Sequence, residues 1–96
     1  MKDTYQWDPE KNLKLITERG VSFEAVVSQI EEGNILAVVR GKGKYSHQKQ
    51  FIVTINQYVY VIPYVEKAGR IFLKTIIPSR KLTKRFLLGG KEDEEI

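Results

Sequence analysis

Residues 70–88, which read RIFLKTIIPSRKLTKRFLL, decide the fold of this chain. The first eight of them are rich in β-branched and aromatic side chains, which favour a strand over residues 70–77. Pro78 has no N–H to donate to a neighbouring strand, so we expect the strand to end there. Ser79 is a favourable N-cap residue, and a short C-terminal helix should therefore begin directly after it.

That expected helix carries four cations and no acid: Arg80, Lys81, Lys84 and Arg85. Like charges four residues apart repel by about 0.2–0.5 kcal/mol per pair, and the first helical turn disfavours positive charge. A helix whose charges oppose its own stability indicates a polyanionic partner such as nucleic acid. The alternative is a solvated helix that binds nothing.

Upstream of this stretch, the apolar pattern has a period of two, which predicts further strands over residues 35–40, 49–56 and 58–65. Asn56 and Gln57 predict a tight turn, and residues 66–69 a four-residue hairpin loop. The last two strands should therefore be adjacent and antiparallel. In the third strand, one face would be formed by Tyr58, Tyr60, Ile62 and Tyr64.

The N-terminal third of the chain reads as two helices. Asp8 followed by Pro9 is a favourable N-cap and first helical residue, which predicts a helix over residues 9–19 with Leu13 and Ile16 facing inward. Ser22 should cap a second helix over residues 23–32, whose inward stripe is Phe23, Val26, Val27 and Ile30. The predicted fold class is α+β, with two N-terminal helices, a four-stranded antiparallel meander and a C-terminal helix.

Composition indicates a single domain of ordinary soluble character. The chain has 96 residues, no cysteine and one histidine, and 42% of its residues are hydrophobic. We expect one domain over residues 1–88 followed by a disordered acidic tail over residues 89–96. The chain has no apolar run of about 18 residues and no secretory signal, so we expect it to be cytoplasmic.

The net charge of +4 is unevenly distributed along the sequence. Residues 1–32 carry a net charge of −3, and residues 91–96 also carry −3. Residues 33–90 hold eleven bases and a single acid, Glu66, which gives a net charge of +10. A segment this basic attracts nucleic acid or another acidic partner.

Three motifs resemble those of the BrnT family. Residues 5–12, YQWDPEKN, resemble that family's opening W-D-x-x-K-N, and residues 20–24, GVSFE, resemble its H-G-V-S-F-E. Residues 75–85, TIIPSRKLTKR, resemble its closing R-I-I-S-A-R-x-A-T. Arg19 stands where the family motif has histidine, and Thr75 stands where it has arginine.

The resemblance implies a RelE-like fold and a ribonuclease toxin of a bacterial type II toxin–antitoxin pair, which cleaves RNA without a metal or other cofactor. It also implies a partner, a DNA-binding antitoxin that is often of the ribbon-helix-helix type. Two other functions stay open. The domain could be a non-catalytic RNA-binding module, or a degenerate toxin that mainly binds its antitoxin.

Cleavage of RNA without a metal must activate the 2′-OH, stabilise a phosphorane-like transition state and protonate the 5′-oxygen. Cations suit the second task, and a group with a pKa near neutrality suits the others. We therefore expect Arg80 and His47 to be catalytic, with Glu10 and Glu18 as alternative bases. The resemblance adds Lys11 as a catalytic residue, because it matches the opening motif of the BrnT family. The expected RNA-binding residues are Arg19, Lys81, Lys84, Arg85 and Tyr60, although tyrosines on one strand face also commonly serve packing.

Overall fold

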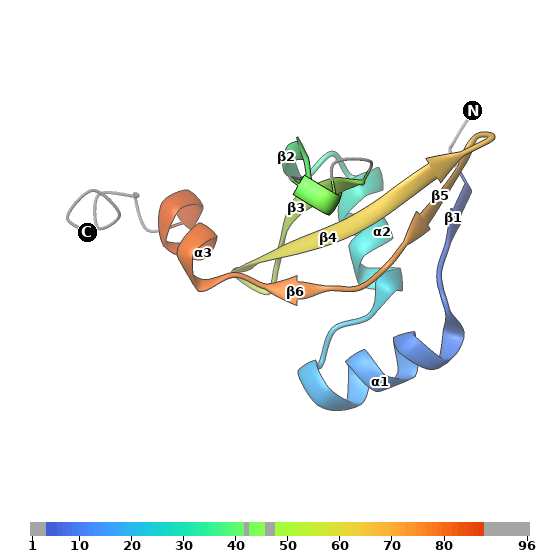
Figure 1. Ribbon diagram of the computed structural model, residues 1–96. Helices are drawn as coiled ribbons and strands as arrows, with labels where there is room; N and C mark the ends of the chain where they lie inside the picture. The colour runs from blue at the N-terminus through green and yellow to red at the C-terminus, as the bar shows by residue number, and fades with distance from the viewer. Residues whose placement is uncertain (1–3, 42, 46–47, 88–96) are drawn as a thin grey trace.

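The protein is a mixed α+β domain. The computed structural model describes residues 4–41, 43–45 and 48–87, so His47 and the predicted acidic tail lie outside the described residues. Helices α1 (Pro9–Arg19) and α2 (Phe23–Glu31) precede most of the sheet, and α3 (Arg80–Leu87) follows the last strand (Figure 1). Within the described residues, no helix is long and apolar enough to span a membrane.

The sheet contains the predicted meander and additional pairing at its ends. The order along the sheet is β1-β5-β4-β3-β2, and β6 also pairs with β4. The predicted antiparallel neighbours β4 and β5 are confirmed, because Lys67 pairs with Arg70 and Tyr64 with Leu73. The bounds are β1 (Thr4–Gln6), β2 (Ile35–Arg40), β3 (Lys49–Ile55), β4 (Tyr58–Lys67), β5 (Arg70–Leu73) and β6 (Ile77–Pro78).

Strand β1 was not predicted as part of the sheet. It pairs in parallel with β5, with Tyr5 opposite Ile71, and Tyr5 packs against the hydrophobic core. A segment of three residues is too short to show a period, so only its partner identifies it as a strand. The expected four-stranded sheet is therefore incomplete at this edge.

The β3–β4 and β4–β5 hairpins turn through residues with positive φ. Asn56 and Gln57 have φ of 53° and 65°, which confirms the predicted tight turn. Ala68 and Gly69 have φ of 55° and 79° and form a second two-residue turn, so the expected four-residue loop is shorter than predicted. Positive φ at both turn residues is the geometry that matches the twist of antiparallel strands.

The predicted continuous strand over residues 70–77 is interrupted. Residues 74–76 are not in a strand, and the registers of β5 and β6 place these three residues opposite Ile62 and Pro63 of β4. One extra residue on one strand is the defining feature of a β-bulge. Pro63 has no N–H for a partner here, while its carbonyl accepts a hydrogen bond from the N–H of Lys74 at 2.8 Å.

The capping residues predicted from sequence set the starts of all three helices. The Asp8 side chain accepts from the N–H of Glu10 at 3.0 Å, and Ser22 Oγ accepts from the N–H of Ala25 at 3.1 Å. Ser79 caps α3 in the same way. These bonds satisfy backbone donors that have no partner within a helix.

The inward face of α1 differs from the prediction. Leu13 and Ile16 are 65% and 44% exposed, whereas Leu15 is 3% exposed and Asn12 is buried. Asn12 Oδ1 accepts from the N–H of Phe23 at 2.8 Å, and this bond turns the Asn12 face of α1 toward the start of α2. The prediction considered apolar residues alone and therefore missed a polar residue that fixes the orientation of the helix.

The main core lies between α2 and the sheet. Phe23 and Val26 of α2 are fully buried, as is Val53 of β3, and the predicted α2 stripe is confirmed. Trp7 stacks on Phe23 with ring centroids 5.6 Å apart, so its packing partner is α2.

Helix α3 and its N-cap are attached to β4 at Val59, whose carbonyl accepts a hydrogen bond from the N–H of Ser79 at 2.9 Å. Thr83 Oγ1 accepts from the N–H of Val59 at 2.9 Å and donates to the carbonyl of Ser79 at 2.7 Å. Val59 is fully buried. The bond therefore satisfies a backbone donor that water cannot reach, and it fixes α3 against the sheet.

Replacing Thr83 with valine keeps the side-chain shape but leaves the Val59 N–H without its partner. We expect the free energy of unfolding, measured by urea denaturation, to fall by about 1–3 kcal/mol. Thr83→Ser retains the hydroxyl and should lose less. Equal stability of the valine and serine variants would contradict this role for the hydroxyl.

The pKa of Glu24 is lowered from 4.5, first by the hydrogen bond from Asn12 and then by its own backbone N–H. Because the folded pKa is depressed, the carboxylate stabilises the fold above the unfolded pKa, and this contribution is lost as the pH falls through the folded pKa. Stability should therefore fall less steeply between about pH 5 and pH 3 in Glu24→Gln than in the parent. Glu31→Gln on the same helix is the control, and identical pH profiles for Glu24→Gln and the parent would refute the prediction.

Candidate nucleic-acid interface

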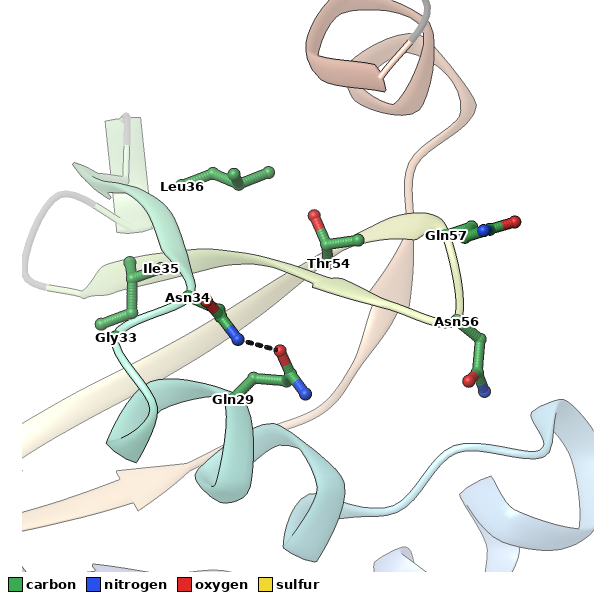
Figure 2. Close-up of a pocket in the computed structure, with 8 residues that line it drawn as sticks. All are labelled: Gln29, Gly33, Asn34, Ile35, Leu36, Thr54, Asn56 and Gln57. Atoms are coloured by element: carbon green, nitrogen blue, oxygen red, sulfur yellow. Dashed lines mark hydrogen bonds between the residues drawn. The ribbon is translucent and has the colours of Figure 1, made fainter.

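The alternation of side chains along β4 divides the molecule into two sides. Tyr60, Ile62 and Tyr64 contact the core beneath α1 and α2, and we call this the helix side. Figure 2 shows α2 on one side of β3 and β4 and α3 on the other. The opposite face, here called the open side, is formed by Val59, Val61, Pro63 and Val65 with their cross-strand neighbours Gln50, Ile52, Phe72 and Ile77.

Helix α3 covers only one end of the open side. Val59 is fully buried where α3 is attached, whereas Val61, Pro63 and Val65 are half-buried and Ile77 is 42% exposed. Ile52, opposite Val61, is also buried, so the accessible part of this face runs from Val61 along β4 to Val65 and includes Ile77.

Seven cations surround the open side. Four are on α3, and all four are exposed. On the strands, Lys67 and Arg70 pair across the β4–β5 hairpin, and Lys74 Nζ lies 5.5 Å from the centroid of the Phe72 ring. Cations are thus present at both ends of the face and in its middle.

The acids that the structure describes lie elsewhere. Those of the N-terminal third belong to α1, α2 and the residues beside them: Asp8, Glu10, Glu18, Glu24, Glu31 and Glu32. Glu66 pairs with Ile71 and lies on the helix side. The pKa of Tyr64 is raised first by burial and then by the negative charge of Glu66. Over residues 4–41, 43–45 and 48–87, the open side therefore carries cations and no acid, whereas the helix side carries the acids together with the α1 cations, Lys49 and Arg40.

The structure brings together four of the predicted site residues. Arg80 is the first residue of α3, and Lys81, Lys84 and Arg85 follow within the same eight-residue helix. The backbone N–H groups of the first turn add a partial positive charge beside Arg80. This end of the open side can therefore hold more than one phosphate.

The other predicted site residues lie apart from α3. Lys11 is half-buried on α1, and Tyr60 is on the helix side, with its ring centroid 5.6 Å from that of Tyr58. Burial, and then Tyr58, raise the pKa of Tyr60. Arg19 ends α1, and its Nη1 donates to the carbonyl of Ile76 at 2.5 Å, beside the break between β5 and β6. His47 lies outside the described residues.

Sequence reasoning missed Phe72 and Lys74 as site candidates. Phe72 stands between the buried residues Ile71 and Leu73, so period two alone places it on the face opposite the core. In a regular strand Lys74 would point away from Thr75, but neither residue is in a strand. A groove of about 390 Å³ at this break is lined by Gln48, Gln50, Pro63, Lys74, Thr75 and Ile77.

A larger groove of about 540 Å³ lies between α2, the start of β2 and the β3–β4 turn (Figure 2). Asn34 Nδ2 donates to Gln29 Oε1 across it at 2.9 Å. None of its lining residues is charged, and the exposed cations are on other elements. The position of the cations, and not the size of the groove, therefore indicates where an anion would bind.

No group of three or more His, Cys, Asp or Glu residues that could hold a metal ion occurs in the part of the chain that the structure describes. Comparison with models of protein families, with curated proteins and with solved structures gave no match.

Proposed function

We propose that this protein is a ribonuclease toxin of a type II toxin–antitoxin pair, with a RelE-like fold and metal-independent cleavage of RNA. The observation that carries the proposal is the division of charge between the two sides of the sheet. The open side, with α3, presents seven cations and no acid among the described residues. The motifs that resemble the BrnT family supply the specific activity and the partner, a DNA-binding antitoxin of the ribbon-helix-helix type.

RNA suits this face because its phosphates supply regularly spaced negative charge. Each phosphate neutralised by a lysine or arginine releases counterions, and this release drives binding at low salt. Arg80 and Lys84, one turn apart on α3, are like charges that repel each other. A bound phosphate would relieve that repulsion, so the local conflict in the helix supports a polyanionic ligand.

Arg80 is the leading candidate for stabilising the transition state. It is exposed at the first position of α3, next to backbone N–H groups that are not used within the helix. A guanidinium can bind two phosphate oxygens at once, which suits a dianionic transition state. Lys81, Lys84 and Arg85 would hold neighbouring phosphates.

Arg19 supports a site that extends from α3 to the β5–β6 break. Among the departures from the BrnT motifs, Arg19 and Thr75 stand at the two positions that are expected to be functional, and Arg19 bonds to the carbonyl of Ile76, the residue after Thr75. Two departures at neighbouring positions point to one altered part of a single site. Lys11, on the helix side, would contribute from a different direction.

A second candidate function is RNA binding without cleavage. The open side has no carboxylate among the described residues, and an arginine cannot act as a general base. If His47 is not the base, the same surface would bind RNA and would leave it intact. In that case the chain would be a binding module or a degenerate toxin that mainly binds its antitoxin.

These alternatives are separated by expressing the chain in bacteria with and without the adjacent reading frame. A toxin should stop growth when expressed alone, and the neighbouring gene should restore it. Purified protein should also cleave RNA in the presence of a chelator. Growth that is unaffected, together with RNA that is bound but intact, would favour the binding module.

The Arg80→Ala variant should lose growth inhibition, because removal of one transition-state donor lowers the rate by about 10²–10³. Stability should be kept or slightly raised, since the first helical turn disfavours a cation. Arg80→Lys should restore activity only in part, because lysine lacks the bidentate geometry.

Lys14→Ala is the matched control for Arg80→Ala, because Lys14 is an exposed cation on α1, on the helix side. It should leave growth inhibition unchanged. An Arg80→Ala variant that remains folded and fully toxic would remove Arg80 from the mechanism.

A further inference from the structure

The β4–β5 hairpin contains a second charge conflict, at the opposite end of β4 from α3. Lys67 and Arg70 pair directly across the two strands, and both are exposed. Like charges in this position destabilise a hairpin. The adjacent acid Glu66 faces the helix side, so its side chain does not lie between the two cations.

Next to this pair, an aromatic ring lies on the open side. Phe72 pairs with Val65 on one strand and with Gln6 on the other, and it is not part of the core beneath α1 and α2. It is half-buried, and Lys74 Nζ lies 5.5 Å from its ring centroid. The ring therefore has cations on two sides of it, Lys74 on one and the hairpin pair on the other.

Phe72 and the hairpin cations line one groove of about 370 Å³, formed by Gln6, Val65, Lys67, Ala68, Arg70 and Phe72. All of the strand residues in this set lie on the open side, and the set contains no acid. The groove thus combines an apolar floor with two cations at its edge.

We propose that this groove is a second binding site for single-stranded RNA, in which a base stacks on Phe72 while Lys67 and Arg70 bind the flanking phosphates. The inference rests on the proposed function, since it takes α3 as the first RNA contact. An aromatic face between cations matches the alternation of bases and phosphates along a single strand. Recognition of a ligand by charge alone would not require the Phe72 ring.

The two sites define a path for the RNA. Strand β4 has ten residues, so its ends are about 30 Å apart at 3.4 Å per residue. Lys74 lies between the hairpin and α3, beside the break that separates β5 from β6. The RNA would therefore run along β4 and β5, with α3 at one end and the hairpin at the other.

The test measures binding of the full chain to a fluorescein-labelled 2′-O-methyl oligouridine of about twelve nucleotides, which lies within the range of single-strand site sizes and cannot be cleaved at the 2′-OH. Phe72→Ala should weaken binding by about 5- to 150-fold, the equivalent of one lost stacking contact. Phe72→Tyr keeps the ring and should bind like the parent. Lys67→Gln with Arg70→Gln should reduce the slope of log affinity against log salt by about 1.4.

Lys14→Gln is the control for nonspecific charge, and circular dichroism checks the fold of each variant. If Phe72→Ala unfolds, the site is tested by the salt slope of the Lys67→Gln with Arg70→Gln variant, because both of these residues are exposed. Normal binding by the hairpin variants, with loss only in Arg80 or Lys84 variants, would overturn the second site and leave the proposed function intact. The second site would also be overturned if Phe72→Ala weakened the binding of heparin as much as the binding of RNA. If the parent does not bind the oligonucleotide at all, the proposed function itself fails.

Discussion

The two faces of β4 are the constraint on which the rest of this structure depends. Because side chains alternate along a strand, burying Ile62 and Tyr64 beneath the N-terminal helices places Val61, Pro63 and Val65 on the other face. The described acids lie on the side of the N-terminal helices, whereas α3, Lys67, Arg70 and Lys74 lie on the opposite face. A division of charge along the sequence thereby becomes a division in space, and one surface is left with cations and without acid among the described residues.

The extra residue between β5 and β6 makes this arrangement possible. In a regular strand, Ile71, Leu73 and Ile77 would share one face, but the bulge lets Ile76 enter the core and turns Ile77 to the open side. The chain then continues through Ser79 to α3 on that side. Pro63 fits opposite the irregularity because no N–H is required there, and Arg19 supplies a donor to the carbonyl of Ile76.

Local chemistry explains which features could be predicted from the sequence. The bounds of α1 and β2 follow from caps and periodicity, which act within a few residues, and the cations of α3 are adjacent in sequence. The bulge, the parallel pairing of β1 and the buried Asn12 depend on partners distant in sequence. For the same reason, the two-residue period of the sequence places Tyr60 and Tyr64 on one face of the strand but does not indicate which face the helices cover. Phe72 and Lys74 became candidates only when the covered face was known.

The attachment of α3 through Thr83 makes the Val59 amide a native reporter of that helix. Its hydrogen bond is to a side chain of α3 and not to a neighbouring strand, so the amide can exchange with deuterium when α3 separates from the sheet while the strands remain paired. The exchange rate of this one amide would therefore give the free energy for detaching the cationic helix, separately from the free energy of global unfolding. A ligand that bridges α3 and the strands would slow the exchange in proportion to its occupancy.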